Sequence, residues 1–137
     1  MLLGRLSGNP CFVAEANGGR VVGFAEGRFR GSTFDGGRIY NERFGEFAEL
    51  PPPHCKLDWI CVADDVRRRG AGRELLHRFA SEALQAGCSH IALKADESSD
   101  NSGRKAFFTG FGFYALDPEL PDHLLGTDLA SLVERTG

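Results

Sequence analysis

The feature that most constrains this chain is a basic, glycine-containing turn between a strand-like run and a helix-like run. Residues 57–62 read Leu-Asp-Trp-Ile-Cys-Val, apolar apart from Asp58, which predicts a strand covered on both faces, with Trp59 in the core. Residues 67–72 read Arg-Arg-Arg-Gly-Ala-Gly, and apolar residues then recur at helical spacing up to Gly87. The segment predicts a strand, a tight turn and an amphipathic helix.

The chemistry of this turn suits an anion. The first N–H groups of a helix lack partners inside the helix and lie at the positive end of its dipole. Gly70 and Gly72 remove side chains that would keep the backbone away from a diphosphate, and the arginines add charge. The turn lacks the GK[ST] ending of a P-loop and the three-glycine spacing of a dinucleotide fingerprint. It predicts a phosphate loop of another kind.

The rest of the chain predicts one α/β domain over residues 1–137. Two short β-runs at 11–16 and 21–25 surround a Gly-rich turn, and residues 91–95 alternate as a second central strand. We expect a long loop over 31–53, and a closing strand, a closing helix or one of each over 124–133. A short helix follows the second central strand, with core residues in and beyond it at Phe107, Phe108, Phe111 and Phe113.

Two motifs carry a resemblance to a known family. The turn resembles motif A of the GNAT superfamily of N-acetyltransferases, whose pyrophosphate loop matches at Arg67, Gly70 and Gly72. The downstream segment resembles the family's motif B, with its asparagine, aromatic pair and Gly-Phe at Asn101, Phe107, Phe108, Gly112 and Phe113. The likeness covers about residues 11–116. It implies a mixed central sheet flanked by helices, with a V-shaped opening between two central strands.

The same resemblance implies a function. Acetyl-CoA would lie in the V between the strand ending at Val62 and the strand from Ile91, and an acceptor amine would attack it directly. The main chain near Val62 would hold the pantetheine and polarise the thioester carbonyl. The implied cofactor-binding residues are Val62, Arg67, Arg68, Arg69, Gly70, Ala71, Gly72, Arg73, Asn101 and Phe108. The acceptor would be a small molecule, such as an amino acid or an antibiotic-like amine, or a protein amino group.

The catalytic groups are less defined. Phe108 stands where the family often has a tyrosine that protonates the departing thiolate, so the thiolate leaves as the anion, takes a proton from water or Tyr114, or catalysis is lost. The last case would leave a non-catalytic acyl-CoA-binding or interaction module. Asp58 is the candidate general base, with a pKa raised by desolvation, unless it pairs with an arginine or faces solvent. Glu26, His54 and Glu97 stay open for this role.

The acceptor side of the site departs from the family pattern. The family normally has a strand and one or two helices before the hairpin, whereas only about ten residues precede it here. The loop over 31–53 or a partner subunit would supply the missing wall, which motivates a hypothesis of homodimerisation.

Charge and cysteine usage exclude several other classes. A net charge of −3 and an arginine cluster that lies in one loop argue against nucleic acid as a partner. No signal peptide or apolar stretch of spanning length is present, which argues against a membrane, and the four cysteines form no CxxC pair, which favours a reducing cytoplasm. A zinc site from His54, Cys55, Cys88 and His90 would lack closely paired ligands, so we expect no metal.

Overall fold

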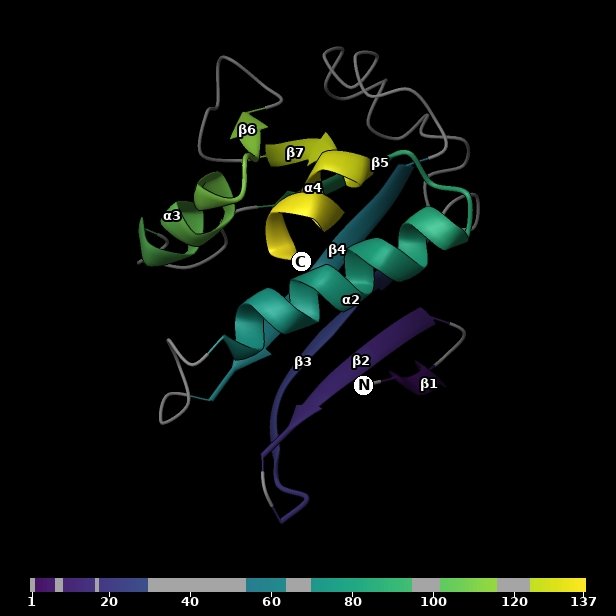
Figure 1. The fold of residues 1–137 in the computed structure, drawn as a ribbon, viewed down its shortest axis with the longest axis vertical. Helices are drawn as coiled ribbons and strands as arrows, with labels where there is room; N and C mark the ends of the chain where they lie inside the picture. Colours follow the sequence, from purple (N-terminus) through teal and green to yellow (C-terminus); the bar gives the residue numbers. More distant parts are fainter. Residues whose placement is uncertain are drawn as a thin grey trace.

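A mixed seven-stranded sheet in the order β1-β2-β3-β4-β5-β7-β6 organises the computed structural model of the chain (Figure 1). The structure describes residues 2–6, 9–16, 18–29, 54–63, 70–94, 102–115 and 124–137. The strands are β1 (Leu2–Leu6), β2 (Asn9–Glu15), β3 (Val21–Arg28), β4 (His54–Val62), β5 (His90–Lys94), β6 (Tyr114–Ala115) and β7 (Leu124–Asp128). The described helices are α2 (Ala71–Gln85), α3 (Ser102–Gly110) and α4 (Leu129–Thr136).

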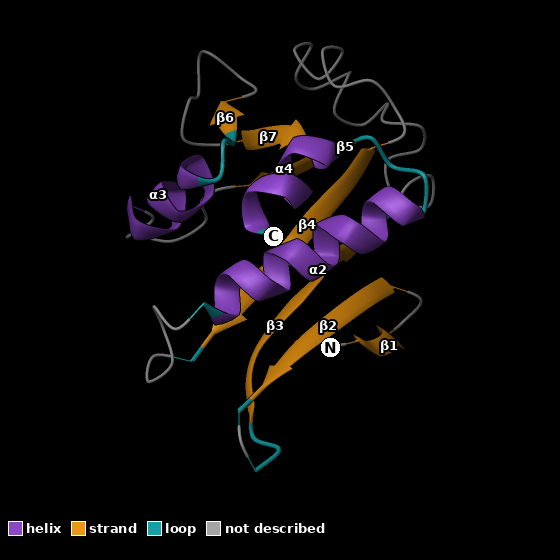
Figure 2. Cartoon of the chain, in the orientation of Figure 1, coloured by secondary structure: helices purple, strands orange, loops and turns teal. Residues whose placement is uncertain are grey.

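The connections confirm most of the predicted elements. β2 and β3 form the predicted hairpin, and β4, α2 and β5 form a unit whose two strands are parallel, whereas the other neighbouring strands are antiparallel (Figure 2). The C-terminal segment contains one strand and one helix. β1 was not predicted, and it pairs with β2 within the short stretch before the hairpin. The loop expected over 31–53 lies outside the described residues.

Helix α2 packs closely on the sheet because β3 presents glycines beneath it. A Cβ atom on Gly23 would lie 3.1 Å from Leu75 Cδ1, and one on Gly27 would lie 2.6 Å from Phe79 Cζ. Helix α2 also packs against β2, β4 and α4. Its apolar stripe therefore rests directly on the strands that precede it.

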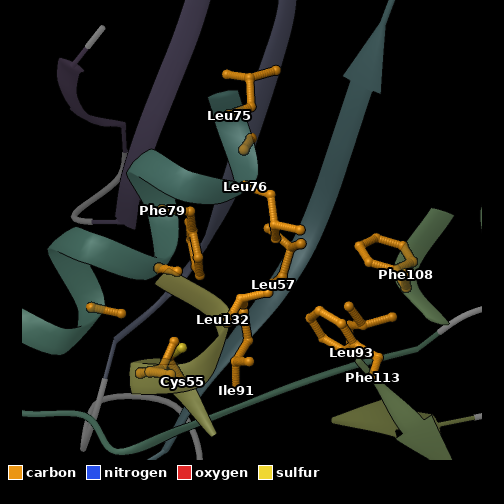
Figure 3. Packing of buried hydrophobic residues seen from close by; sticks show 14 of the residues in the cluster. Cys55, Leu57, Leu75, Leu76, Phe79, Ile91, Leu93, Phe108, Phe113 and Leu132 are labelled. Atoms are coloured by element: carbon orange, nitrogen blue, oxygen red, sulfur yellow. The ribbon is translucent and has the colours of Figure 1, made fainter. Parts of the chain in front are cut away.

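The core lies between the sheet and these helices. Figure 3 shows Leu57 of β4 and Ile91 of β5 beneath side chains of α2 and α4, with Phe108 of α3 gathered beside Leu93 and Phe113. Phe108 and Phe113 are buried, and Phe107 and Phe111 are half-buried against the same cluster. These four positions confirm the expectation that the phenylalanines belong to the core.

A β-bulge in β4 corrects the prediction for Trp59. The register with β3 passes from Gly27 opposite Leu57 to Glu26 opposite Trp59, so Asp58 is an extra residue. An extra residue exchanges the two faces of the strand beyond it, because side chains alternate with a period of two. Trp59 consequently leaves the core face and is 57% exposed. Leu57 and Ile60 contact the core on either side of the bulge.

Candidate functional site

At the end of β4, main-chain polar groups point toward the β5 side of the strand. The ladder between β4 and β5 ends at the pair Leu57–Leu93, while β4 continues to Val62. The Ala63 N–H donates to Val22 O at 2.7 Å, on the β3 side. Because backbone polar groups alternate between the two edges of a strand, the Val62 N–H and C=O point to the β5 side. The pantetheine contact at Val62 stays a prediction.

The start of α2 offers accessible main chain. Gly70 precedes the helix in the left-handed conformation, with φ 87° and ψ 1°, and its carbonyl accepts the first helical bond from Glu74 N at 2.9 Å. The N–H groups of residues 71–73 have no carbonyl one turn earlier within the helix. Among the described residues, nothing lies within 4 Å of a Cβ atom added to Gly70. In that part of the structure, the space beside these donors is open for an anion to approach.

Gly72 brings three elements together at this point. A Cβ atom on Gly72 would lie 3.3 Å from Phe107 Cε1 in α3 and 3.8 Å from Val62 Cγ2 in β4. Glycine therefore lets the first turn of α2 pack against both neighbours. The strand end, the helix start and α3, which the two motifs predicted as parts of one site, are adjacent.

The Arg73 side chain binds the end of the chain rather than the turn, where only its main-chain N–H was predicted to meet the diphosphate. Its Nε donates to Thr136 O at 3.0 Å and its Nη2 to Gly137 O at 2.7 Å, so the guanidinium binds the C-terminal end of α4. Only its main-chain N–H belongs to the open turn. Beside this contact lies an open hollow of about 530 Å³ lined by Gly70, Arg73, Glu74, His77, Arg78, Thr136 and Gly137.

Asp58, the candidate general base, is held in an ion-pair cluster at the bulge. Its Oδ2 lies 3.0 Å from Arg28 Nε and its Oδ1 lies 3.4 Å from Lys56 Nζ. Pairing with an arginine is the alternative interpretation that the sequence left open. Glu26 is half-buried and lies opposite Trp59 across the β3–β4 ladder, next to this cluster.

Comparison with known proteins decides the family. The family model described as the acetyltransferase (GNAT) family matches residues 3–113. The chain belongs to the GNAT family of acetyltransferases. A comparison with curated protein sequences gives no match.

Solved structures show the same GNAT fold. A GNAT acetyltransferase from Staphylococcus aureus Mu50 has a TM-score of 0.63 and 15% identity over 90% of this chain and 69% of its own. The KacTA–DNA complex has a TM-score of 0.61 and 16% identity over 92% of this chain and 71% of its own. AtaTR bound with AcCoA has a TM-score of 0.59 and 14% identity over 90% of this chain and 69% of its own. At these identities the likeness shows the fold. The expectation that nucleic acid is not a partner of this chain stays a prediction.

The motif B aromatic lies inside the GNAT core. Phe108 is fully buried, and its ring packs edge-to-face on Phe107 at 5.1 Å and on Phe113 at 5.2 Å between centroids. Tyr114, the other candidate proton donor, is 47% exposed on β6, the outer strand of the sheet next to β7. Arg67, Arg68, Arg69 and Asn101 lie outside the described residues, so their predicted contacts stay predictions.

The cysteine and histidine positions weighed for zinc are partly brought together. His54 and His90 are register partners in β4 and β5, and the Cys55 and Cys88 side chains are hydrogen-bonded and buried. Burial raises the pKa of the Cys55 thiol, which disfavours the thiolate that binds metal. In the described part of the chain, no three potential ligands gather, and no helix is long and apolar enough to cross a membrane.

Proposed function

We propose that this GNAT domain transfers an acetyl group from acetyl-CoA to an amine by direct attack. The observation that carries the proposal is the juxtaposition of the open first turn of α2 with the β5-facing main chain of β4 at Gly72 and Val62. Helix N-termini with glycine favour phosphate groups, and an outward strand edge suits an amide-containing arm. The AcCoA in the AtaTR structure, which shares the fold, agrees with this choice of donor.

The chain's residues divide the binding of acetyl-CoA between them. The N–H groups of residues 71–73 would bind the diphosphate, with charge added by the arginines at 67–69. The β5-facing edge of β4 at Val62 would hydrogen-bond the pantetheine arm. Bound there, acetyl-CoA supplies the acyl group as an activated thioester.

The chemical step needs few side chains. A donor N–H on the β4 edge polarises the thioester carbonyl, and its fixed direction makes it effective as charge develops on the oxygen. The neutral acceptor amine attacks the carbonyl carbon, so a C–N bond forms while the C–S bond breaks. The proton lost by the amine goes to a base or to water. Since Phe108 has no proton to give, the thiolate leaves as the anion or takes a proton from water.

A non-catalytic acyl-CoA-binding module on the same fold is the second candidate. The complete burial of Phe108, at the position where motif B often has an ionisable ring, favours it. The two functions differ in thiol release when amines are offered with acetyl-CoA. The catalytic proposal includes an acceptor that is a small amine or a protein amino group. It also includes a cytoplasmic location, which suits four cysteines without disulfide bonds.

Calorimetric titration of acetyl-CoA into the wild type and two glycine variants tests the site. Gly70→Ala places a methyl group in the open space beside the helix donors and should weaken binding at least tenfold. Gly18→Ala is the matched control, because Gly18 has φ 89° against 87° for Gly70, and both have open space around Cβ. Each substitution should cost about 1 kcal/mol of stability.

The titration and a thiol-release assay together distinguish the phosphate site, the catalytic function and the non-catalytic module. Equal binding by both variants, or no binding by the wild type, would overturn the phosphate site at Gly70. Binding by the wild type with no thiol release, from any small amine or from lysine-containing peptides, would favour the non-catalytic module.

A further inference from the structure

We propose that the last turn of α4 is a clamp that fixes the relative position of the two walls of the acetyl-CoA site. The clamp consists of Arg135, Thr136 and Gly137, and the walls are the first turns of α2 and the C-terminal end of α3. This inference rests on the proposed function, because it concerns the same site. It assigns a positioning role to a helix that neither motif includes.

On the α2 side, hydrogen bonds join two residues to the end of α4. Arg73 donates to the carbonyl oxygens of Thr136 and Gly137, as described above. One turn further along α2, His77 Nδ1 lies 2.9 Å from Thr136 Oγ1. The Thr136 hydroxyl donates to Leu132 O at 2.7 Å, so its oxygen is free to accept the proton of Nδ1. Two successive turns of α2 are thus attached to one turn of α4.

The contact on the α3 side comes from the preceding residue. Arg135 Nη1 donates to Phe111 O at 3.3 Å, in the turn that ends α3. A Cβ atom on Gly112 would lie 2.7 Å from Arg135 Cζ, so the guanidinium lies directly over this glycine. Gly112 has φ 93° and belongs to the same turn, whose Phe113 N–H bonds back to Phe108 O at 3.2 Å. The end of α3 therefore rests on Arg135.

Successive residues of α4 thus reach opposite walls. Arg135 contacts the end of α3 and Thr136 contacts α2, and α4 lies between these two helices in Figure 1. The walls also touch each other where Gly72 meets Phe107. A change at the end of α4 would alter how α2 and α3 sit around that contact, and with them the predicted phosphate donors.

Charge gives the clamp a second effect. The C-terminal end of a helix carries partial negative charge, and here it lies next to the N-terminus of α2. The Arg73 guanidinium binds those carbonyl oxygens and offsets their charge near the proposed diphosphate site. Losing the guanidinium would both loosen the first turn of α2 and leave this negative end facing the phosphates.

Steady-state kinetics on the full chain test the clamp through the KM for acetyl-CoA. Arg73→Ala, Thr136→Val and Arg135→Ala should each raise KM or Kd by roughly five- to tenfold, the worth of one or two hydrogen bonds, while kcat at saturation changes less than twofold. Arg73→Lys keeps the charge and one donor and should restore part of the loss. Glu134→Ala, an exposed residue of the same turn, is the matched control.

Hydrogen exchange without acetyl-CoA gives an independent measurement. The three clamp variants should exchange faster at residues 74–76 and at the turn after α3, with unchanged exchange in β3. Unchanged exchange at both walls would overturn the clamp even if the wild type binds acetyl-CoA. Faster exchange with unchanged KM would overturn its role in cofactor positioning. A wild type that binds no acetyl-CoA would overturn the proposed function and this role together.

Discussion

At the scale of single residues, the roles of the glycines in the turn could be predicted from the sequence, but the contact of the neighbouring Arg73 side chain could not. Gly70 and Gly72 follow from the need for close backbone approach, and the structure gives each a physical reason in an open left-handed turn and a tight contact with Phe107. The side chain of Arg73 looks like part of the same cationic cluster in the sequence. Its partners, Thr136 at the end of α4 and the C-cap Gly137, lie 63 and 64 residues away, and no local pattern indicates such a contact.

The two candidate catalytic residues lie on strands that are far apart in the sheet. Asp58 lies in the bulge on β4, the strand that ends at Val62 in the proposed site. Tyr114 is on β6, separated from β4 by β5 and β7, so the two strands are roughly 14 Å apart at an ordinary spacing of about 4.8 Å. The strand order therefore favours loss of the thiolate as the anion, or its protonation by water, over a proton from Tyr114.

Asp58→Asn tests whether the carboxylate is a base or a structural ion-pair partner. We expect kcat to fall less than tenfold and stability to fall by about 1–2 kcal/mol, since Arg28 and Lys56 would both lose their ion pair with this carboxylate. Urea unfolding and amine acetylation at saturating acetyl-CoA measure the two effects. Glu15→Gln, which changes an exposed carboxylate on β2, is the control. A loss beyond about a hundredfold in kcat with unchanged stability would instead make Asp58 the general base.

At the scale of elements, prediction succeeded where local pattern and tertiary packing agree. The β4–α2–β5 unit and the β2–β3 hairpin followed from periodicity and turn residues. β1 was missed because its short run carries no alternation to separate it from a leading segment. The ending of the chain stayed ambiguous because β7 and α4 follow one another directly, with Asp128 as both the last strand residue and the N-cap of the helix.

That N-cap predicts a pH-dependent contribution to stability. Asp128 Oδ2 accepts from the Ser131 N–H at 2.9 Å, and this bond lowers the pKa of the Asp128 carboxyl. A lowered pKa means that the carboxylate stabilises the fold above its unfolded-state pKa and loses this effect as pH falls through the folded value. Asp128→Ala should cost about 1 kcal/mol at pH 7.

Thermal unfolding between pH 7 and pH 3 measures this prediction. The difference in Tm between wild type and Asp128→Ala should shrink as the pH falls below about 4, the ordinary range for aspartate. Ser131→Ala is the control, because it retains the backbone donor. A difference that stays constant over this range would contradict an ionised cap.

At the scale of the whole molecule, the sheet is unequally covered. Helices α2 and α4 pack on one face, whereas Trp59 and Cys61 on the other are exposed beyond the bulge. The family and its fold could be predicted from two motifs, but the acceptor could not, since it depends on contacts that vary within the fold.

We expect the protein to form a homodimer. A partner subunit would cover the exposed Trp59 and Cys61, so we expect sedimentation velocity at increasing protein concentration to show a species of twice the 14.9 kDa chain mass. Trp59→Ser, which removes the largest exposed apolar side chain in β4, is the variant to compare. A sedimentation mass equal to one chain at the highest concentration would contradict the prediction.

The bulge at Asp58 changes which positions of β4 tolerate polar substitutions, because the core-facing positions are different on its two sides. Up to Leu57, odd-numbered positions face the core, and from Ile60 onward even-numbered positions do. A saturation scan along the strand would therefore find polar substitutions rejected at 55, 57, 60 and 62 and accepted at 59 and 61. Deleting residue 58 would remove the bulge and leave a regularly alternating strand, in which Leu57, Ile60 and Val62 still face the core and Trp59 still faces away from it.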